Sequence, residues 1–151
     1  MKIMMVCLGN ICRSPLAHGI LQARIDERQL DWQVESSGTS SWHSGEGPDQ
    51  RSVEVAAENG IDISRQRSQQ FRKQDLQEFD HVIVMDSSNY NNVMELASTP
   101  AEEAKVSLLL NYSYPGENRQ VPDPYYAGGF PFVFDLVSQA VDAFIEQQLD
   151  V

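Results

Sequence analysis

Cysteine and histidine are scarce in this sequence, which has two cysteines and three histidines among 151 residues. Two cysteines cannot supply the several disulfide bonds that stabilise small secreted domains, so we expect a reducing, cytoplasmic environment. No second cysteine pair or closely spaced histidine pair completes a zinc site. No apolar run reaches the length of a membrane-spanning helix, and no signal peptide precedes the first apolar segment. We therefore expect no bound metal and no membrane association.

Positive charge is also scarce, with 11 lysines and arginines against 22 aspartates and glutamates. The formal net charge of −11 argues against nucleic acid or an anionic membrane surface as the main partner. An anion would need a local positive site, because the overall field repels it. The sequence shows no repeat, low-complexity tract or linker, so residues 1–151 are expected to form one domain.

Short apolar runs alternate with helical patterns along the chain. Strands are expected over residues 2–6, 32–36, 81–85 and 106–109, and helices over residues 15–29, 48–59, 87–96 and 132–149, with a short helix between residues 61 and 80. This alternation predicts a doubly wound α/β domain, in which helices cover both faces of a four-stranded parallel sheet. In such sheets ligands bind beyond the carboxyl ends of the strands, where Cys7 and Asp86 both fall.

The most informative stretch is Val-Cys-Leu-Gly-Asn-Ile-Cys-Arg-Ser-Pro at residues 6–15. It follows the first strand, and Ser14 and Pro15 suit the N-cap and the first position of a helix. Five residues separate Cys7 from Arg13, enough for a loop that curls around one tetrahedral oxyanion. Backbone N–H groups, the helix N-terminus and the planar Arg13 guanidinium would bind the anion. Cys7 would lie beneath it, where the positive field favours the nucleophilic thiolate.

This stretch has three other interpretations. Cys7 would be an inert core cysteine, the commonest fate of a lone cysteine, or Cys7 and Cys12 would be two metal ligands. A nucleotide-binding loop is a third possibility, but the glycines and lysine of a Walker-type loop are missing. Asn10, Ser14 and Pro15, together with the strand-to-helix setting, favour the oxyanion loop.

Two side chains elsewhere carry separate expectations. Residues 38–49 are rich in Ser, Gly and Thr and are expected to form a loop. Trp42 in this loop is either a partly buried anchor or one wall of a binding cleft. His18, in the first helix, is expected at the surface.

Residues 6–15, together with Asp-Pro-Tyr-Tyr at residues 123–126, resemble the low-molecular-weight protein tyrosine phosphatases. The similarity extends along the chain through residues 36–39, 42–43 and 85–89. The resemblance implies a four-stranded parallel sheet with flanking helices, as in the type I phosphotyrosine phosphatase fold, and no metal or organic cofactor.

Carried onto this chain, the resemblance implies that Cys7 is the nucleophile and that Arg13 clamps the phosphoryl oxygens. The phosphate would bind to the loop residues Leu8, Gly9, Asn10, Ile11, Cys12 and Ser14. Asn10 would set the shape of the loop by tolerating a left-handed conformation. The Ser14 hydroxyl would hydrogen-bond the Cys7 thiolate.

The resemblance also implies roles for the second motif. Asp123 would protonate the leaving phenolate oxygen and then activate water against the phosphocysteine. The prolines on both sides of Asp123 restrict its backbone and would hold the carboxylate in place; without the cysteine loop, Asp123 would be interpreted as an ordinary turn residue. Tyr125 and Tyr126, with Trp42 opposite, would form aromatic walls for a phenyl ring.

The predicted function is hydrolysis of phosphotyrosine and small aryl phosphates through a phosphocysteine. One alternative is a thiol-dependent arsenate reductase, but its disulfide relay needs further cysteines and this chain has none beyond Cys12. A non-catalytic phosphate-binding module would need neither Cys7 nor Asp123. By analogy with bacterial members, the protein partner would be a tyrosine kinase or a polysaccharide-export protein, and the chain would act as a monomer or weak dimer.

Cys12 carries a further hypothesis. It lies five positions after Cys7, and a curled loop would bring the two sulfurs close. Because a thiolate is readily oxidised to a sulfenic acid, we expect peroxide to drive a reversible Cys7–Cys12 disulfide that protects Cys7. The competing interpretation is that Cys12 simply packs as a small apolar residue.

Overall fold

The computed structural model describes residues 1–150. In chain order, the elements are β1 (Lys2–Cys7), α1 (Arg13–Arg28), β2 (Gln33–Gly38), α2 (Gln50–Glu58), α3 (Asp75–Glu78), β3 (His81–Val84), α4 (Ser87–Met94), α5 (Pro100–Glu103), β4 (Val106–Leu108), the 3₁₀ helix η1 (Leu109–Asn111), α6 (Pro124–Ala127) and α7 (Phe130–Leu149). Within residues 1–150, no helix is both long enough and apolar enough to cross a membrane.

The sheet has four parallel strands in the order β2-β1-β3-β4. β1 is therefore an inner strand, and its residues Ile3 to Val6 are all buried, as expected for a parallel strand covered on both faces. Because all four strands run the same way, their carboxyl ends lie along one edge of the sheet. The predicted fold class is confirmed.

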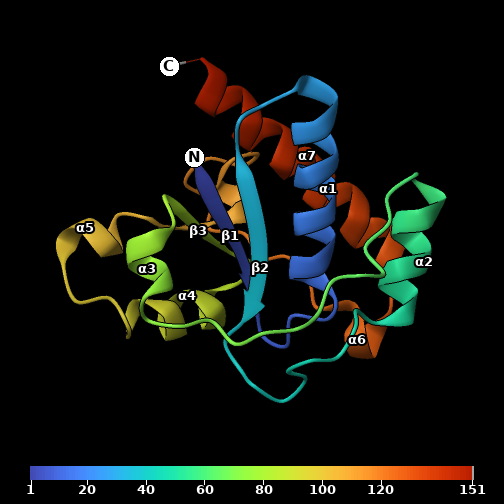
Figure 1. Ribbon diagram of the computed structural model, residues 1–151, viewed down its shortest axis with the longest axis horizontal. Coiled ribbons are helices and arrows are strands. Elements are labelled where there is room, and N and C mark those ends of the chain that lie inside the picture. The colour runs from blue at the N-terminus through green and yellow to red at the C-terminus, as the bar shows by residue number, and fades with distance from the viewer. Residues whose placement is uncertain (151) are drawn as a thin grey trace.

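Two layers of helices enclose the sheet (Figure 1). Ile3 and Met5 of β1 face one side, where they share a core with residues of α1, α2 and α7. Met4 and Val6 face the opposite side, in a core that includes residues of α3 and α4. The alternation of side chains along a strand thus separates the buried residues of β1 into two cores.

The starts of α1, α2 and α7 differ from the predictions by two residues each, whereas α4 begins at Ser87 as predicted. α1 begins at Arg13 with no side-chain cap, so the assignment of Ser14 as an N-cap is wrong; its hydroxyl lies near Cys7 instead. α4 is capped by Asp86, whose carboxylate accepts a hydrogen bond from the Asn89 N–H at 2.8 Å. α7 begins at Phe130, two residues before the predicted start, because the preceding glycine adopts a left-handed conformation.

His18 is not the surface residue that the sequence suggested. It lies half-buried on the face of α1 toward β2, where its Nδ1 is 3.1 Å from the Ser36 hydroxyl. Burial lowers the pKa of His18 to about 4 from its ordinary value of 6.5. The imidazole is consequently neutral in the folded protein at pH 7.

We predict that His18 weakens the protein in mild acid. The pKa of His18 is lower in the folded than in the unfolded state. The contribution of the neutral imidazole to the free energy of unfolding is therefore complete above pH 6.5 and is lost as the pH falls toward 4. Between pH 7 and pH 4.5, protonation of this imidazole should lower the free energy of unfolding by about 2 kcal/mol. Urea unfolding at pH 7 and pH 4.5 measures the difference: His18→Gln should lose less stability than wild type, and equal losses would contradict the assignment.

Candidate active site

The segment between β1 and α1 curls into the loop that the sequence predicts. The Asn10 N–H points back toward β1 and donates to Cys7 Sγ at 3.3 Å. Cys7 and Arg13, at the two ends of the loop, both line one pocket at the carboxyl edge of the sheet. The other loop residues that line this pocket are Leu8, Gly9, Ile11 and Cys12.

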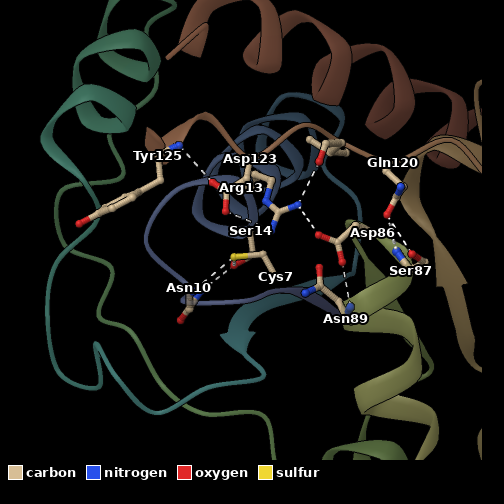
Figure 2. Close-up of polar contacts among 11 residues, drawn as sticks. Cys7, Asn10, Arg13, Ser14, Asp86, Ser87, Asn89, Gln120, Asp123 and Tyr125 are labelled. Atoms are coloured by element: carbon tan, nitrogen blue, oxygen red, sulfur yellow. Dashed lines mark hydrogen bonds and ion pairs between the residues drawn. The ribbon is translucent and has the colours of Figure 1, made fainter. Parts of the chain in front are cut away.

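Asn10 and Ser14 support the Cys7 sulfur from behind the loop (Figure 2). Asn10 has a φ of +56°, the expected left-handed conformation, and its Nδ2 donates to Ser14 Oγ at 2.8 Å. Because Ser14 Oγ accepts that bond, its own proton is available for Cys7 Sγ, 3.0 Å away. The backbone N–H of Gln69 in turn donates to Asn10 Oδ1 at 3.0 Å. The sulfur thus lies within hydrogen-bond distance of the Asn10 N–H and of the Ser14 hydroxyl.

Arg13 is a buried cation held by groups from distant parts of the chain. Its side chain is only 3% exposed, and Nη1 donates to Asp86 Oδ2 at 2.7 Å and to the Val121 carbonyl at 3.0 Å. Burial alone would lower the pKa of Arg13, but the negative charges of Cys7, Asp86 and Asp123 outweigh it and raise the pKa. The guanidinium stays charged beside the pocket.

Asp123 lies across the pocket from the loop. Its Oδ1 accepts from the Tyr125 N–H at 3.1 Å, which makes Asp123 the N-cap of α6, and its Oδ2 is 3.7 Å from Arg13 Nη2. The carboxylate is partly exposed and lines the same pocket as Cys7. A nucleophile, a cation and a carboxylate therefore meet in one cavity (Figure 2).

Aromatic side chains form the mouth of the pocket. Trp42 and Tyr126 are 77% and 91% exposed, and both line the pocket together with Tyr125. The rings of Tyr125 and Tyr126 meet edge to face with centroids 4.8 Å apart. Such exposure is inconsistent with a buried anchor and leaves the cleft wall as the interpretation of Trp42.

Comparison with known proteins identifies the family. The sequence profile described as "Low molecular weight phosphotyrosine protein phosphatase" matches residues 2–150. The chain belongs to this family. A putative low molecular weight protein-tyrosine-phosphatase of Synechocystis is 43% identical over 146 residues, covering 93% of this chain and 91% of the relative.

Solved structures agree with this assignment. A protein tyrosine phosphatase from Entamoeba histolytica superposes with a TM-score of 0.91 at 30% identity, covering 99% of this chain and 97% of that one. The Drosophila arginine phosphatase has a TM-score of 0.90 at 31% identity and covers 98% of both chains.

Two residues at this site had no role predicted from the sequence. Asp86 was placed beyond the end of a strand, but nothing in the spacing indicated that it would pair with Arg13. Gly38 is another: a Cβ there would lie 2.7 Å from the Leu8 carbonyl oxygen and 3.0 Å from the Asn10 nitrogen. Only glycine lets the end of β2 approach so closely the back of the loop between Cys7 and Arg13, which we call the phosphate loop after its expected ligand.

We therefore predict that Gly38→Ala displaces the phosphate loop. The new methyl group would press on backbone atoms that cannot rotate away, at a cost of about 1–3 kcal/mol. Gly47→Ala is the matched control, because its Cβ would meet only the mobile end of Arg67 at 3.4 Å. Gly38→Ala should lower both the melting temperature and the affinity for phosphate measured by calorimetry. Equal behaviour of the two variants would contradict the steric argument.

Proposed function

We propose that this family member hydrolyses phosphotyrosine in proteins, and small aryl phosphates, through a phosphocysteine intermediate. The observation that carries the proposal is the convergence of Cys7, Arg13 and Asp123 on one pocket with an aromatic mouth. Each of the three supplies one part of phosphoryl transfer: a nucleophile, a clamp for charged oxygens and a proton donor.

In the first step, the Cys7 thiolate attacks phosphorus and the bond to the phenolic oxygen breaks. Backbone N–H groups of residues 8–14 and the Arg13 guanidinium bind the phosphoryl oxygens and stabilise the charge that spreads over them. Asp123 enters this step protonated and transfers its proton to the leaving oxygen, so that a neutral phenol departs. The two donors facing Cys7 Sγ stabilise the thiolate before attack and after its release.

In the second step, water attacks the phosphocysteine. Asp123, now ionised, accepts a proton from the water, and the sulfur leaves as a thiolate that Ser14 and Asn10 again hydrogen-bond. Inorganic phosphate is the product, and the enzyme returns to its starting protonation state.

The walls of the pocket favour an aromatic leaving group. Leu8, Trp42, Tyr125 and Tyr126 offer apolar surface between the mouth and the phosphate loop, which suits a phenyl ring. We propose a phosphotyrosine protein in the cytoplasm as substrate, with a tyrosine kinase or a polysaccharide-export protein as the partner by analogy.

The test is a leaving-group series with wild type, Asp123→Asn and Cys7→Ser. Asp123→Asn should lower kcat on phenyl phosphate by about 10²–10⁴-fold, because a basic phenolate needs a proton to depart. The loss should be smaller on p-nitrophenyl phosphate, whose leaving oxygen is less basic, and Cys7→Ser should abolish turnover on both. Equal losses for both substrates would make Asp123 a purely structural residue.

Parallel assays address the alternatives. Wild type is given arsenate with a thiol, and phosphoarginine, because the Drosophila structure is titled an arginine phosphatase. Turnover of arsenate or phosphoarginine without turnover of phosphotyrosine would overturn the proposed function. Binding of phosphate without any turnover would instead identify a phosphate-binding module.

We further propose that Cys12 forms a reversible disulfide with Cys7 under peroxide. The Cys7 thiolate attacks peroxide and becomes a sulfenic acid; Cys12 sulfur then attacks Cys7 sulfur, and hydroxide leaves as water. Both cysteines are free thiols in the structure. Burial, with the negative charges of Asp49, Cys7 and Asp123, raises the pKa of Cys12 to about 12, so Cys12 is protonated at pH 7.

This pKa makes the protection depend on pH. As long as the pH is below the pKa of Cys12, its thiolate fraction grows about tenfold for each unit by which the pH rises. Disulfide closure should therefore compete better with further oxidation at higher pH. After peroxide and then dithiothreitol, wild type should recover more activity at pH 8.5 than at pH 6.5. Cys12→Ser should recover little at either pH, and equal recovery by both proteins would leave Cys12 a packing residue.

A further inference from the structure

The start of α2 contacts the back of the phosphate loop. The Asp49 N–H donates to the Ile11 carbonyl at 2.8 Å, and the Ser52 hydroxyl is 3.4 Å from the Cys12 carbonyl. The carboxylate of Asp49 also caps α2 by accepting the Arg51 N–H at 2.9 Å. This turn is therefore fixed to the loop that surrounds the nucleophile.

Arg51 extends from this turn to the segment that carries Asp123, which we call the acid loop (residues 121–129). Its Nε and Nη2 bind the two Asp49 oxygens at 3.0 and 2.9 Å, which orients the guanidinium. Nη2 also donates to the Tyr125 carbonyl at 3.1 Å. Figure 1 shows the corresponding arrangement, with α6 beside the N-terminal end of α2.

Arg51 also bridges the joint between α6 and α7. Gly128 and Gly129 both have positive φ, +79° and +81°, so the backbone there is intrinsically permissive. The guanidinium stacks on Tyr125 before the glycines and on Phe130 after them, 5.7 and 4.6 Å from the ring centroids. One side chain thus contacts the chain on both sides of the two glycines.

The Tyr125 peptide connects this contact to Asp123. The Tyr125 carbonyl accepts from Arg51, while the Tyr125 N–H donates to Asp123 Oδ1. A shift of α6 would move that N–H and with it the carboxylate that faces Arg13. The direction of the Asp123 side chain is therefore linked to Arg51, which does not itself line the pocket.

We propose that Arg51 is a positioning residue that holds the acid loop so that Asp123 points at the leaving oxygen. The proposal rests on the proposed function, because it assumes that Asp123 transfers a proton. A simple ion pair does not account for the contacts: the pair with Asp49 joins residues only two positions apart, and the Arg51 side chain is 48% exposed, so the pair contributes little to stability. The contacts of Arg51 with residues distant in the sequence are those with the Tyr125 carbonyl and with the rings of Tyr125 and Phe130.

The first experiment measures kcat/KM for phenyl phosphate and p-nitrophenyl phosphate in Arg51→Met. A misaligned acid should lower the value for phenyl phosphate by about tenfold and that for p-nitrophenyl phosphate by no more than about twofold. Arg24→Met is the matched control, since Arg24 joins α1 to α7 through Asp142 at 2.9 Å, away from the pocket, and should change neither value. Arg51→Lys should fall between wild type and Arg51→Met, because one ammonium cannot bind Asp49 and the Tyr125 carbonyl in the same geometry.

The second experiment adds Arg51→Met to Asp123→Asn. If Arg51 acts only through Asp123, the double variant should be no slower on phenyl phosphate than Asp123→Asn alone. A further loss in the double variant, or equal losses on both substrates in Arg51→Met, would overturn the positioning role. Failure of the proposed function has a different signature, because wild type would then lack aryl phosphatase activity or Asp123→Asn would show no leaving-group dependence.

Discussion

A buried arginine in a strongly acidic protein is the constraint on which the rest of the site depends. Arg13 is 3% exposed, and an uncompensated charge at that depth would be costly. Its compensation comes from three places: the loop before α1 with Cys7, the end of β3 with Asp86, and the acid loop with the Val121 carbonyl and Asp123. Satisfying this one cation brings together the segments that the chemistry needs.

The parallel sheet makes this arrangement possible. Cys7 ends β1, and Asp86 follows its neighbour β3, so the two residues emerge at the same edge although they lie far apart in the sequence. The net charge of −11 would keep a phosphate dianion away, and the local field of Arg13 with the loop N–H groups reverses that effect.

Contacts with several other segments hold the loop in place. Asn10 links the loop to Ser14 and Gln69, Gly38 lets β2 approach it, and the turn before α2 binds the Ile11 carbonyl. The acid loop has fewer restraints: α6 is a four-residue helix followed by two glycines of positive φ. Arg51 connects the turn before α2, which is hydrogen-bonded to the phosphate loop, to the less restrained acid loop.

The sequence by itself determined what depends on local geometry. Strand and helix periodicity indicated the parallel α/β sheet, and the spacing of Cys7 and Arg13, together with the strand-to-helix setting, indicated the oxyanion loop. The left-handed conformation that Asn10 adopts was implied by the family resemblance. The role expected of Asp123 came from the resemblance, and the prolines on both sides supported it because they restrict its backbone. These features are set by residues within a few positions of one another.

Only the tertiary structure decided which distant groups meet. The sequence predicts Ser14 as a helix cap because capping is a common local role of serine, but its hydroxyl instead lies within hydrogen-bond distance of Cys7 Sγ and accepts from Asn10 Nδ2. His18 seemed exposed because helical position alone does not show that β2 covers it. The Arg13–Asp86 pair joins residues 73 positions apart, and the Arg51–Tyr125 contact joins residues 74 apart. Such pairings depend on strand order and on the packing of α2 against the acid loop, and no spacing within the sequence encodes either.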